Sequence, residues 1–245
     1  MLGKSTRGGP FIRLKPNEID LQKRGDHCFD SAANPMPFHS PQAAYSFSFT
    51  TGALFVPETL AIARQFREIH DWKQVAATTR SENLLRQRTE ASTARLLREI
   101  RPRLEQLSPA ELDFLVGADP RDQRLLLFIT VCRRYRFIRE FTTEVLWPKI
   151  QASETQVYPG DLVRFIEDKG IHAPEVEKLT DKSRAKVRQV ILRILSEAGL
   201  MDSTESRKLQ RPVPSRSLAK LLMENDSKQL RCLLLSEQEI RQITH

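Results

Sequence analysis

Residues 179–200 read LTDKSRAKVRQVILRILSEAGL, and this stretch predicts one long amphipathic helix. Thr180 and Asp181 provide an N-terminal cap, and Gly199 follows the last periodic residue, as is typical of a helix C-terminus. A helix with a single apolar stripe is expected to bury that stripe against other elements. The stripe consists of Val187, Val190, Ile191, Ile194, Leu195 and Ala198.

The face opposite the apolar stripe is strongly basic. Residues 180–216 contain nine basic and four acidic side chains, a net charge of +5. Lys and Arg on a helix face neutralise phosphates, and Gln can bond to a base edge, although such a face can also be a plain solvated surface. Basic residues in the loop after the helix would reach the adjacent DNA backbone. The candidate DNA-contacting residues are Lys182, Arg184, Lys186, Arg188, Gln189, Arg193, Arg207, Lys208 and Arg211.

Shorter elements flank this helix. Asp161 is expected to cap a helix that ends at Gly170, and a brief helix follows at residues 174–179. After the long helix, residues 200–202 and 209–213 predict two short strands that form a small β-hairpin around a polar loop. Three helices followed by a hairpin is the order of a winged helix-turn-helix.

Capping signals divide residues 45–152 into short helices. Residues 108–111 form a capping box with Pro at the first helical position, and Asp119-Pro120 repeats this arrangement. Asp71 is a further N-cap, and Pro148 marks the end of the last helix. Short connections between capped helices are typical of a helical bundle.

The first 44 residues differ from the rest of the chain. They hold five of its fourteen prolines and show no sustained hydrophobic period, so an extended or disordered arm is expected. His27, Cys28 and His39 lie in this arm, but their spacing lacks the second pair of ligands that a zinc site needs, and no metal site is predicted. Order is expected to begin with the alternating aromatic residues of YSFSFT, residues 45–50.

Composition excludes several classes of protein. The chain has 245 residues and a net charge of +8, and its 9 Gly and 7% aromatic residues argue against an all-β fold. The longest apolar run, residues 125–132, is much shorter than the roughly 20 residues of a membrane span, and no secretory signal is visible. The three cysteines are far apart and form no CxxC pair. A soluble, cytoplasmic protein is therefore expected.

The sequence contains no familiar catalytic motif. It lacks G-x-S-x-G, a P-loop, H-E-x-x-H and a Gly-rich dinucleotide fingerprint. Asp161 with residues 167–169 imitates the acidic set of a metal-dependent nuclease, but one helix cannot supply the two strands on which such a site is normally built. We therefore expect a non-enzymatic protein with no cofactor and no small-molecule substrate.

A second basic region lies in the first half of the chain. These arginines could follow DNA phosphates, or could pair with glutamates inside the bundle, and the sequence favours neither interpretation. The region comprises Arg80, Arg86, Arg88, Arg95, Arg98, Arg101 and Arg103, followed by Arg133, Arg134, Arg136 and Arg139.

Four stretches, in order and with matching gaps, carry a resemblance to a known family: YSFSFTTGAL (45–54), ENLLRQRT (82–89), CRRYRFIREFTTEVL (132–146) and residues 179–200. Together they resemble the BrxA family of bacteriophage-exclusion (BREX) defence systems. The resemblance implies a small, mainly helical, non-enzymatic protein, similar in part to the NusB antitermination factor. It also implies binding of double-stranded DNA and work beside the other BREX defence proteins.

The prediction is thus a mainly all-α protein, with a NusB-like bundle at residues 45–152 and a winged-helix-like DNA-binding unit with closing helices at residues 153–245. Its expected function is that of a DNA-binding accessory subunit of a BREX system. Two alternatives remain: a scaffold whose basic faces dock acidic protein partners, and a NusB-like RNA-binding factor. The scarcity of aromatic residues in the basic regions argues against stacking on single strands.

Overall fold

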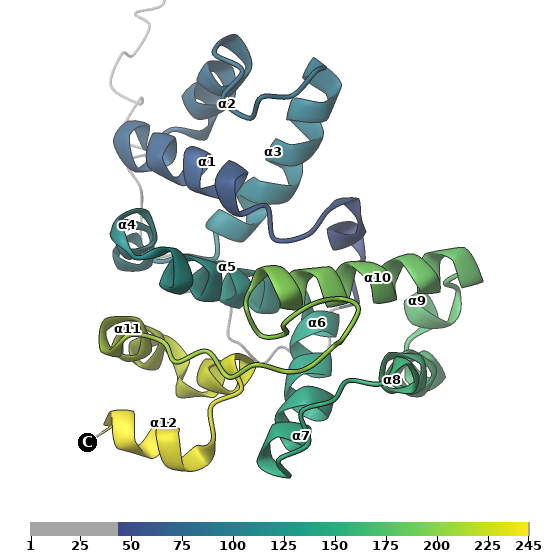
Figure 1. Cartoon of the computed structure of the whole chain (residues 1–245). Coiled ribbons are helices and arrows are strands. Elements are labelled where there is room, and N and C mark those ends of the chain that lie inside the picture. Colours follow the sequence, from purple (N-terminus) through teal and green to yellow (C-terminus); the bar gives the residue numbers. More distant parts are fainter. Residues whose placement is uncertain (1–43, 245) are drawn as a thin grey trace, which may run out of the picture. The chain divides into compact units, whose positions relative to one another are not determined.

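The computed structural model describes residues 44–244, and this part of the chain is mainly helical, as predicted (Figure 1). The predicted arm, except for Ala44, lies outside the described residues, and so do His27, Cys28 and His39. The helices are α1 (Val56–Ile69), α2 (Trp72–Ser81), α3 (Glu90–Leu104), α4 (Pro109–Gly117), α5 (Pro120–Arg134), α6 (Arg136–Glu140), α7 (Trp147–Gln151), α8 (Pro159–His172), α9 (Pro174–Glu177), α10 (Asp181–Glu197), α11 (Arg216–Asp226) and α12 (Glu237–Thr244).

Local capping chemistry places most of the helix starts. The Asp71 carboxylate accepts the backbone N–H of Lys73 at 2.7 Å and so caps α2. The capping box at residues 108–111 is complete, and Asp119 caps α5 through two backbone N–H groups. These starts confirm the prediction, because each cap satisfies backbone donors that a helix leaves open at its N-terminus.

Two predicted helix ends are wrong. Pro148 does not end its helix, because a π-helical turn (Phe141–Leu146) joins α6 to α7 and Trp147 N–H donates to Thr142 O, five residues back. This wider turn makes room for the Pro ring, which has no N–H to donate. In α8 the helix continues past Gly170 to His172. The predicted cap of this helix is also wrong, because the N-cap is Tyr158, and Asp161 lies in the first turn and accepts the N–H of Tyr158 at 2.8 Å.

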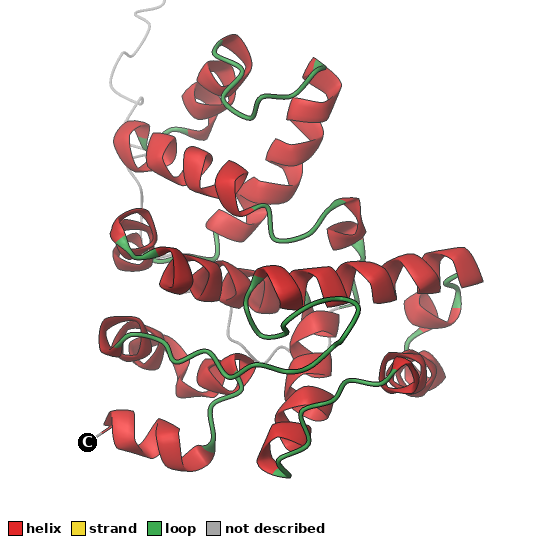
Figure 2. Cartoon of the chain, viewed as in Figure 1, coloured by secondary structure: helices red, strands yellow, loops and turns green. Residues whose placement is uncertain are grey.

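The predicted hairpin is reduced to backbone bridges, and the described residues contain no strand (Figure 2). Met201 faces Leu209 in an isolated antiparallel bridge, and Gln156 pairs with Lys208 in a second one. The pairing of the two predicted segments is thus present but very short. Pro212 and Pro214 follow immediately and lack the N–H groups that would extend a ladder.

The core is built around α5. Its run Leu125–Cys132 is buried on every side, because α1, α3, α4, α6 and α10 contact it together with the 3₁₀ segment Ser227–Leu233. A helix that is apolar all round is expected in such a central place. Helices from both sides of residue 152 contribute to this one apolar cluster. The division into two domains at that residue stays a prediction.

Within residues 44–244, no helix combines the length and the apolar character that crossing a lipid bilayer requires.

Candidate nucleic-acid interface

The long helix predicted from residues 179–200 is α10, and its two faces differ as expected. All six residues of the apolar stripe are buried, and Ile191 and Ile194 are fully inaccessible. Thr180 caps the helix by accepting the N–H of Ser183 at 3.2 Å, and Gly199 adopts a left-handed φ of 78° just after its end. Packing on the core therefore fixes the rotation of α10 about its axis. The predicted DNA-contacting residues that are exposed on the other side are Lys182, Lys186, Gln189 and Arg193.

Arg184 lies away from this exposed face. Its Nε donates to Leu179 O at 3.0 Å, and one of its terminal nitrogens donates to Glu177 O at 3.0 Å. These carbonyls belong to the C-terminal end of α9 and the connection to α10, where helical partners are missing. Arg184 thus ties α9 to α10, and its guanidinium is occupied by backbone acceptors.

Some of the other predicted DNA-contacting residues form an ion pair or a side-chain hydrogen bond within the protein. Arg193 forms an ion pair with Glu197 at 2.7 Å, and Lys186 Nζ donates to the Gln189 side chain at 3.2 Å. Arg207 Nε donates to Thr204 O at 3.1 Å. In contrast, no ion pair is formed within residues 44–244 by Lys182, Arg188 or Lys208.

A groove runs beside α10, between the start of α8 and the turn at residues 203–207. Its volume is about 630 Å³. The walls are partly apolar, and Tyr158 contributes an aromatic ring that is 54% exposed. Four of the nine predicted residues line this groove: Arg188, Gln189, Arg193 and Arg207. The apolar walls come from Leu162, Val163 and Leu192. The sequence does not indicate this groove, because an aromatic residue before a Pro-Gly pair, such as Tyr158, is too common to predict one.

The turn that follows α10 carries balanced charge. Asp202 accepts the N–H of Ser203 at 2.6 Å and that of Lys208 at 3.0 Å. The hydrogen bond from the Ser206 side chain and these backbone bonds lower the pKa of Asp202, so it is ionised at neutral pH. Glu205 lies in the same turn, and its pKa is lowered chiefly by the Thr204 hydroxyl. The two carboxylates therefore offset Arg207 and Lys208, and the excess positive charge lies on α10.

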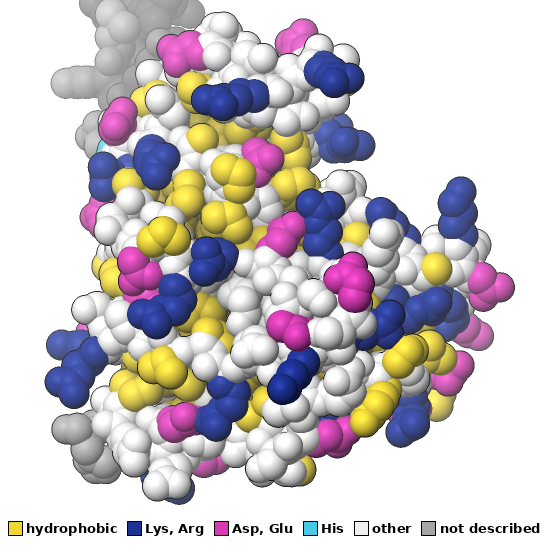
Figure 3. Space-filling view, viewed as in Figure 1, with side chains coloured by type: hydrophobic (Ala, Val, Ile, Leu, Met, Phe, Trp, Pro, Cys, Tyr) yellow, Lys and Arg dark blue, Asp and Glu magenta, His cyan; other side chains and the backbone are white. Residues whose placement is uncertain are grey.

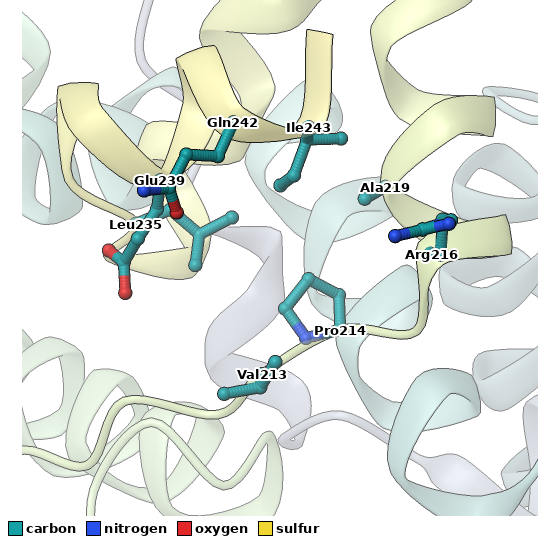
Figure 4. Close-up of a pocket in the computed structure, with 8 residues that line it drawn as sticks. All are labelled: Val213, Pro214, Arg216, Ala219, Leu235, Glu239, Gln242 and Ile243. Atoms are coloured by element: carbon teal, nitrogen blue, oxygen red, sulfur yellow. The ribbon is translucent and has the colours of Figure 1, made fainter. Parts of the chain in front are cut away.

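Arg211 lies close to α12, away from the groove beside α10. Its guanidinium forms an ion pair with Glu239 of α12. Glu239 lines a pocket of about 420 Å³ between the segment around Val213, α11 and α12, with Arg216 on the opposite side (Figure 4). Arg211 thus lies beside the C-terminal helices, and it does not line the groove beside α10.

Of the eleven arginines in the second basic region, Arg139 is buried, and the other ten divide into two groups. Arg103 is buried and pairs with Glu99 at 2.8 Å, and Arg133 pairs with the fully buried Glu111 at 2.5 Å. Arg136 and Arg101 also pair with glutamates, at 2.5 and 2.7 Å. Internal pairing therefore accounts for these four residues. A second group is exposed and forms no ion pair in the described part of the chain: Arg80, Arg86, Arg88, Arg95, Arg98 and Arg134.

Two members of the set that imitates a nuclease site, Asp161 and Lys169, form ion pairs with other residues. Asp161 lies 3.2 Å from Lys149, and Lys169 pairs with Glu140 and Glu144 at 2.6 and 2.8 Å. Among the residues that the structure describes, no group of three or more His, Cys, Asp or Glu side chains is placed to hold a metal ion.

Known proteins resemble the chain at the levels of family, sequence and fold. The BrxA family model matches residues 43–226. The BREX protein BrxA of Bacillus cereus (strain H3081.97) is 26% identical over 134 residues, which cover 54% of this chain and 67% of that protein. An uncharacterized protein from Magnetospirillum magneticum has a crystal structure with a TM-score of 0.68 at 20% identity, covering 78% of this chain and 98% of that one. At this identity the structural likeness shows a shared fold.

Proposed function

The chain belongs to the BrxA family, and from that premise we propose that it is a non-enzymatic accessory subunit of a BREX phage-defence system that binds double-stranded DNA through α10. The proposed binding is mainly to phosphates. Other BREX proteins are its expected partners.

The observation that supports this proposal is that α10 is amphipathic, with one buried apolar side and one basic side. Its apolar side is locked into the core, while its opposite side presents Lys182, Lys186 and Arg188 to solvent or to the edge of a groove. A rigid helix with cations on one side needs no reordering of its backbone when it meets a duplex. Lys and Arg at such positions release condensed counterions from DNA, which is the main source of sequence-independent affinity.

Several of the nine predicted DNA-contacting residues are removed from the proposed DNA-binding surface by their neighbours in the fold. Arg184 is occupied at the end of α9, Arg211 pairs with Glu239, and the turn after α10 holds two carboxylates, Asp202 and Glu205. The proposed phosphate contacts are therefore made chiefly by Lys182, Lys186 and Arg188, while Arg193 on the same face shares its charge with Glu197. Gln189 is the candidate for a contact to a base edge, because it is exposed on the same face.

Binding to nucleic acids across a salt series tests this proposal. Fluorescence anisotropy would compare a labelled random duplex, a single strand and a duplex RNA. We expect the tightest binding to the DNA duplex. On a plot of log affinity against log salt concentration, the slope should be negative, with a magnitude of about 0.9 for each phosphate contact. Absence of duplex binding at low salt would overturn the proposal, and preference for RNA would favour the NusB-like alternative.

A second candidate function rests on the walls of the groove. Tyr158 and Val163 are apolar side chains that remain more than one third exposed beside Arg188 and Arg207. An exposed apolar wall with a cationic rim also suits an acidic protein segment that inserts an apolar side chain. In that case the salt series would show weak DNA binding by the wild type. A Val163→Glu variant would then no longer bind a BREX protein partner, and its affinity for DNA would equal that of the wild type.

A further inference from the structure

The exposed arginines around the end of α2 and the start of α3 form a second cationic surface. We name it the α2–α3 corner and define it by Arg80, Arg86 and Arg88. We propose that the α2–α3 corner is a second phosphate-binding surface, which contacts the same DNA duplex as α10. This inference rests on the proposed function, and it adds a part of the molecule that neither the predicted winged unit nor the family relationship assigns.

Burial and pairing separate these arginines from the others in the bundle. Arg103 and Arg133 have side chains that are 1% and 3% exposed, and each has a glutamate partner. All three arginines of the α2–α3 corner are exposed, and within residues 44–244 none of them forms an ion pair. The charge of the interior arginines is thus used for folding, whereas that of the corner is open to an external anion.

The α2–α3 corner surrounds a shallow hollow of about 490 Å³. Arg80 and Arg88 line it together with the side chains of Ser81, Asn83 and Gln87 and the start of α3. Glu90 also borders it, and Ala77 is its one apolar residue. A polar hollow with two guanidinium groups suits a hydrated phosphate, because Arg donates paired N–H groups to phosphate oxygens. It offers no wall for an apolar side chain of a protein partner, in contrast with the groove beside α10.

The backbone that presents these arginines is fixed. Leu85 is buried, and Asn83 Oδ1 accepts the N–H of Gln87 at 2.9 Å. Gln87 Nε2 donates to Leu85 O at 2.8 Å, and Arg86 N–H donates to Asn83 O at 2.8 Å. Arg86 itself has a φ of 49°, a region that non-glycine residues rarely adopt. The loop is therefore held in one shape, which lowers the entropy cost of binding through its side chains.

The α2–α3 end of the bundle and α10 are both visible in one view of the molecule (Figure 1). In the view of Figure 3, several Lys and Arg side chains lie at the α2–α3 end, among acidic and uncharged surface, and others recur along α10. Two separated cationic surfaces on one duplex act as linked contacts, so loss of either is expected to weaken binding of the whole.

Chemical modification of arginine tests the proposal directly. A dicarbonyl reagent such as p-hydroxyphenylglyoxal reacts with exposed guanidinium groups, and mass spectrometry of the full-length protein reads each site separately. We expect a random DNA duplex to slow modification at Arg80, Arg86 and Arg88 as well as at Arg188, and to leave Arg216 of α11 unchanged. Protection of Arg188 alone would overturn this inference and leave the proposed function standing. Protection at no site would overturn both.

Charge reversal supplies an independent measurement. We expect Arg80→Glu with Arg88→Glu to weaken duplex binding by about tenfold or more and to reduce the log-log salt slope by about 2, one phosphate contact for each arginine. The matched control is Arg216→Glu with Lys220→Glu, which changes the same net charge at two exposed positions of α11. Equal weakening in both variants would overturn the inference. Should the reversal impair folding, Arg80→Gln with Arg88→Gln removes the charges with less repulsion.

Discussion

Arg193 Nε donates to Glu197 Oε1 at 2.7 Å, and the other oxygen of that carboxylate accepts the backbone N–H of Leu54 at 2.8 Å. Glu197 therefore links the exposed face of α10 to the segment that precedes α1. Arg193 is the one cation on the exposed face of α10 that has a carboxylate partner in the described part of the chain. Substitution of Arg193 thus affects both the surface charge and this link, whereas Lys182 and Lys186 have no such second role.

Reversal of charge on α10 is predicted to weaken DNA binding without unfolding the protein. Lys182→Glu, Lys186→Glu and Arg193→Glu all lie opposite the buried stripe. We expect affinity for a duplex to fall well over tenfold, through lost phosphate contacts, with helical content unchanged by circular dichroism. A double variant without the Arg193 change tests whether exposing Glu197 contributes. Unchanged affinity in the folded triple variant would contradict the proposed surface.

Arg184 is predicted to matter for stability and not for DNA. Arg184→Ala removes donors from the carbonyls at the end of α9, so we expect a loss of about 1 to 2 kcal/mol in the free energy of unfolding. The salt slope of DNA binding should stay that of the wild type. Urea denaturation and the anisotropy series measure the two quantities. A reduced salt slope with unchanged stability would return Arg184 to the DNA-contacting set.

Ile191 is predicted to be essential to the core. It is fully buried, so Ile191→Asp places an unpaired charge in an apolar environment. We expect a loss of more than about 3 kcal/mol in the free energy of unfolding, measured by thermal denaturation. Ile191→Val is the control and should cost about 1 kcal/mol. A melting temperature equal to that of the wild type for Ile191→Asp would show that the stripe is not core.

The buried pair of Glu99 and Arg103 is predicted to respond strongly to loss of one partner. Arg103 also donates to Ala53 O at 2.9 Å, and Glu99 accepts the hydroxyl of Tyr135. Arg103→Met leaves the Glu99 carboxylate without its cation, so we expect a loss of about 3 to 5 kcal/mol in stability. Arg101→Met, which breaks the exposed pair with Glu105, should cost at most about 1 kcal/mol. Equal losses in urea denaturation would refute this distinction.

Acid stability is predicted to depend on Glu140. Burial would raise the pKa of this carboxyl, but hydrogen bonds from Lys169, Tyr45 and Arg136 outweigh burial and hold its pKa below the ordinary value of 4.5. Because the pKa is lower in the folded than in the unfolded state, the ionised carboxylate stabilises the fold at pH values above the unfolded-state pKa. This stabilisation is lost as the pH falls through the folded-state pKa.

We therefore expect the stability difference between wild type and Glu140→Gln to be largest near neutral pH and to shrink as the pH falls below the ordinary value of 4.5 and through the lowered folded-state pKa. Urea titrations at a series of pH values measure this difference. A difference that is constant over the range would show that Glu140 is not held ionised by its partners.

Local signals in the sequence were sufficient for several helix starts. Caps such as Asp71, the box at residues 108–111 and Asp119 act within one turn, so a few neighbouring residues determine them. The stripe of α10 was also predictable, because the helical period decides which residues share a face. Resemblance to the BrxA family followed from ordered stretches of sequence and needed no structure.

Tertiary structure alone decided which charges are available to a ligand. Arg133 pairs with Glu111, 22 residues away, and Arg211 pairs with Glu239, while Arg80 and Arg88 find no such partner in the described residues. The groove beside α10 likewise depends on contacts between distant segments, because its walls come from the start of α8, from α10 and from the turn at residues 203–207. The sequence by itself determined the helices and the basic face of α10, because those follow from neighbours along the chain. The fold determined which arginines form ion pairs within the protein, because an ion pair requires its two residues to lie close together in space.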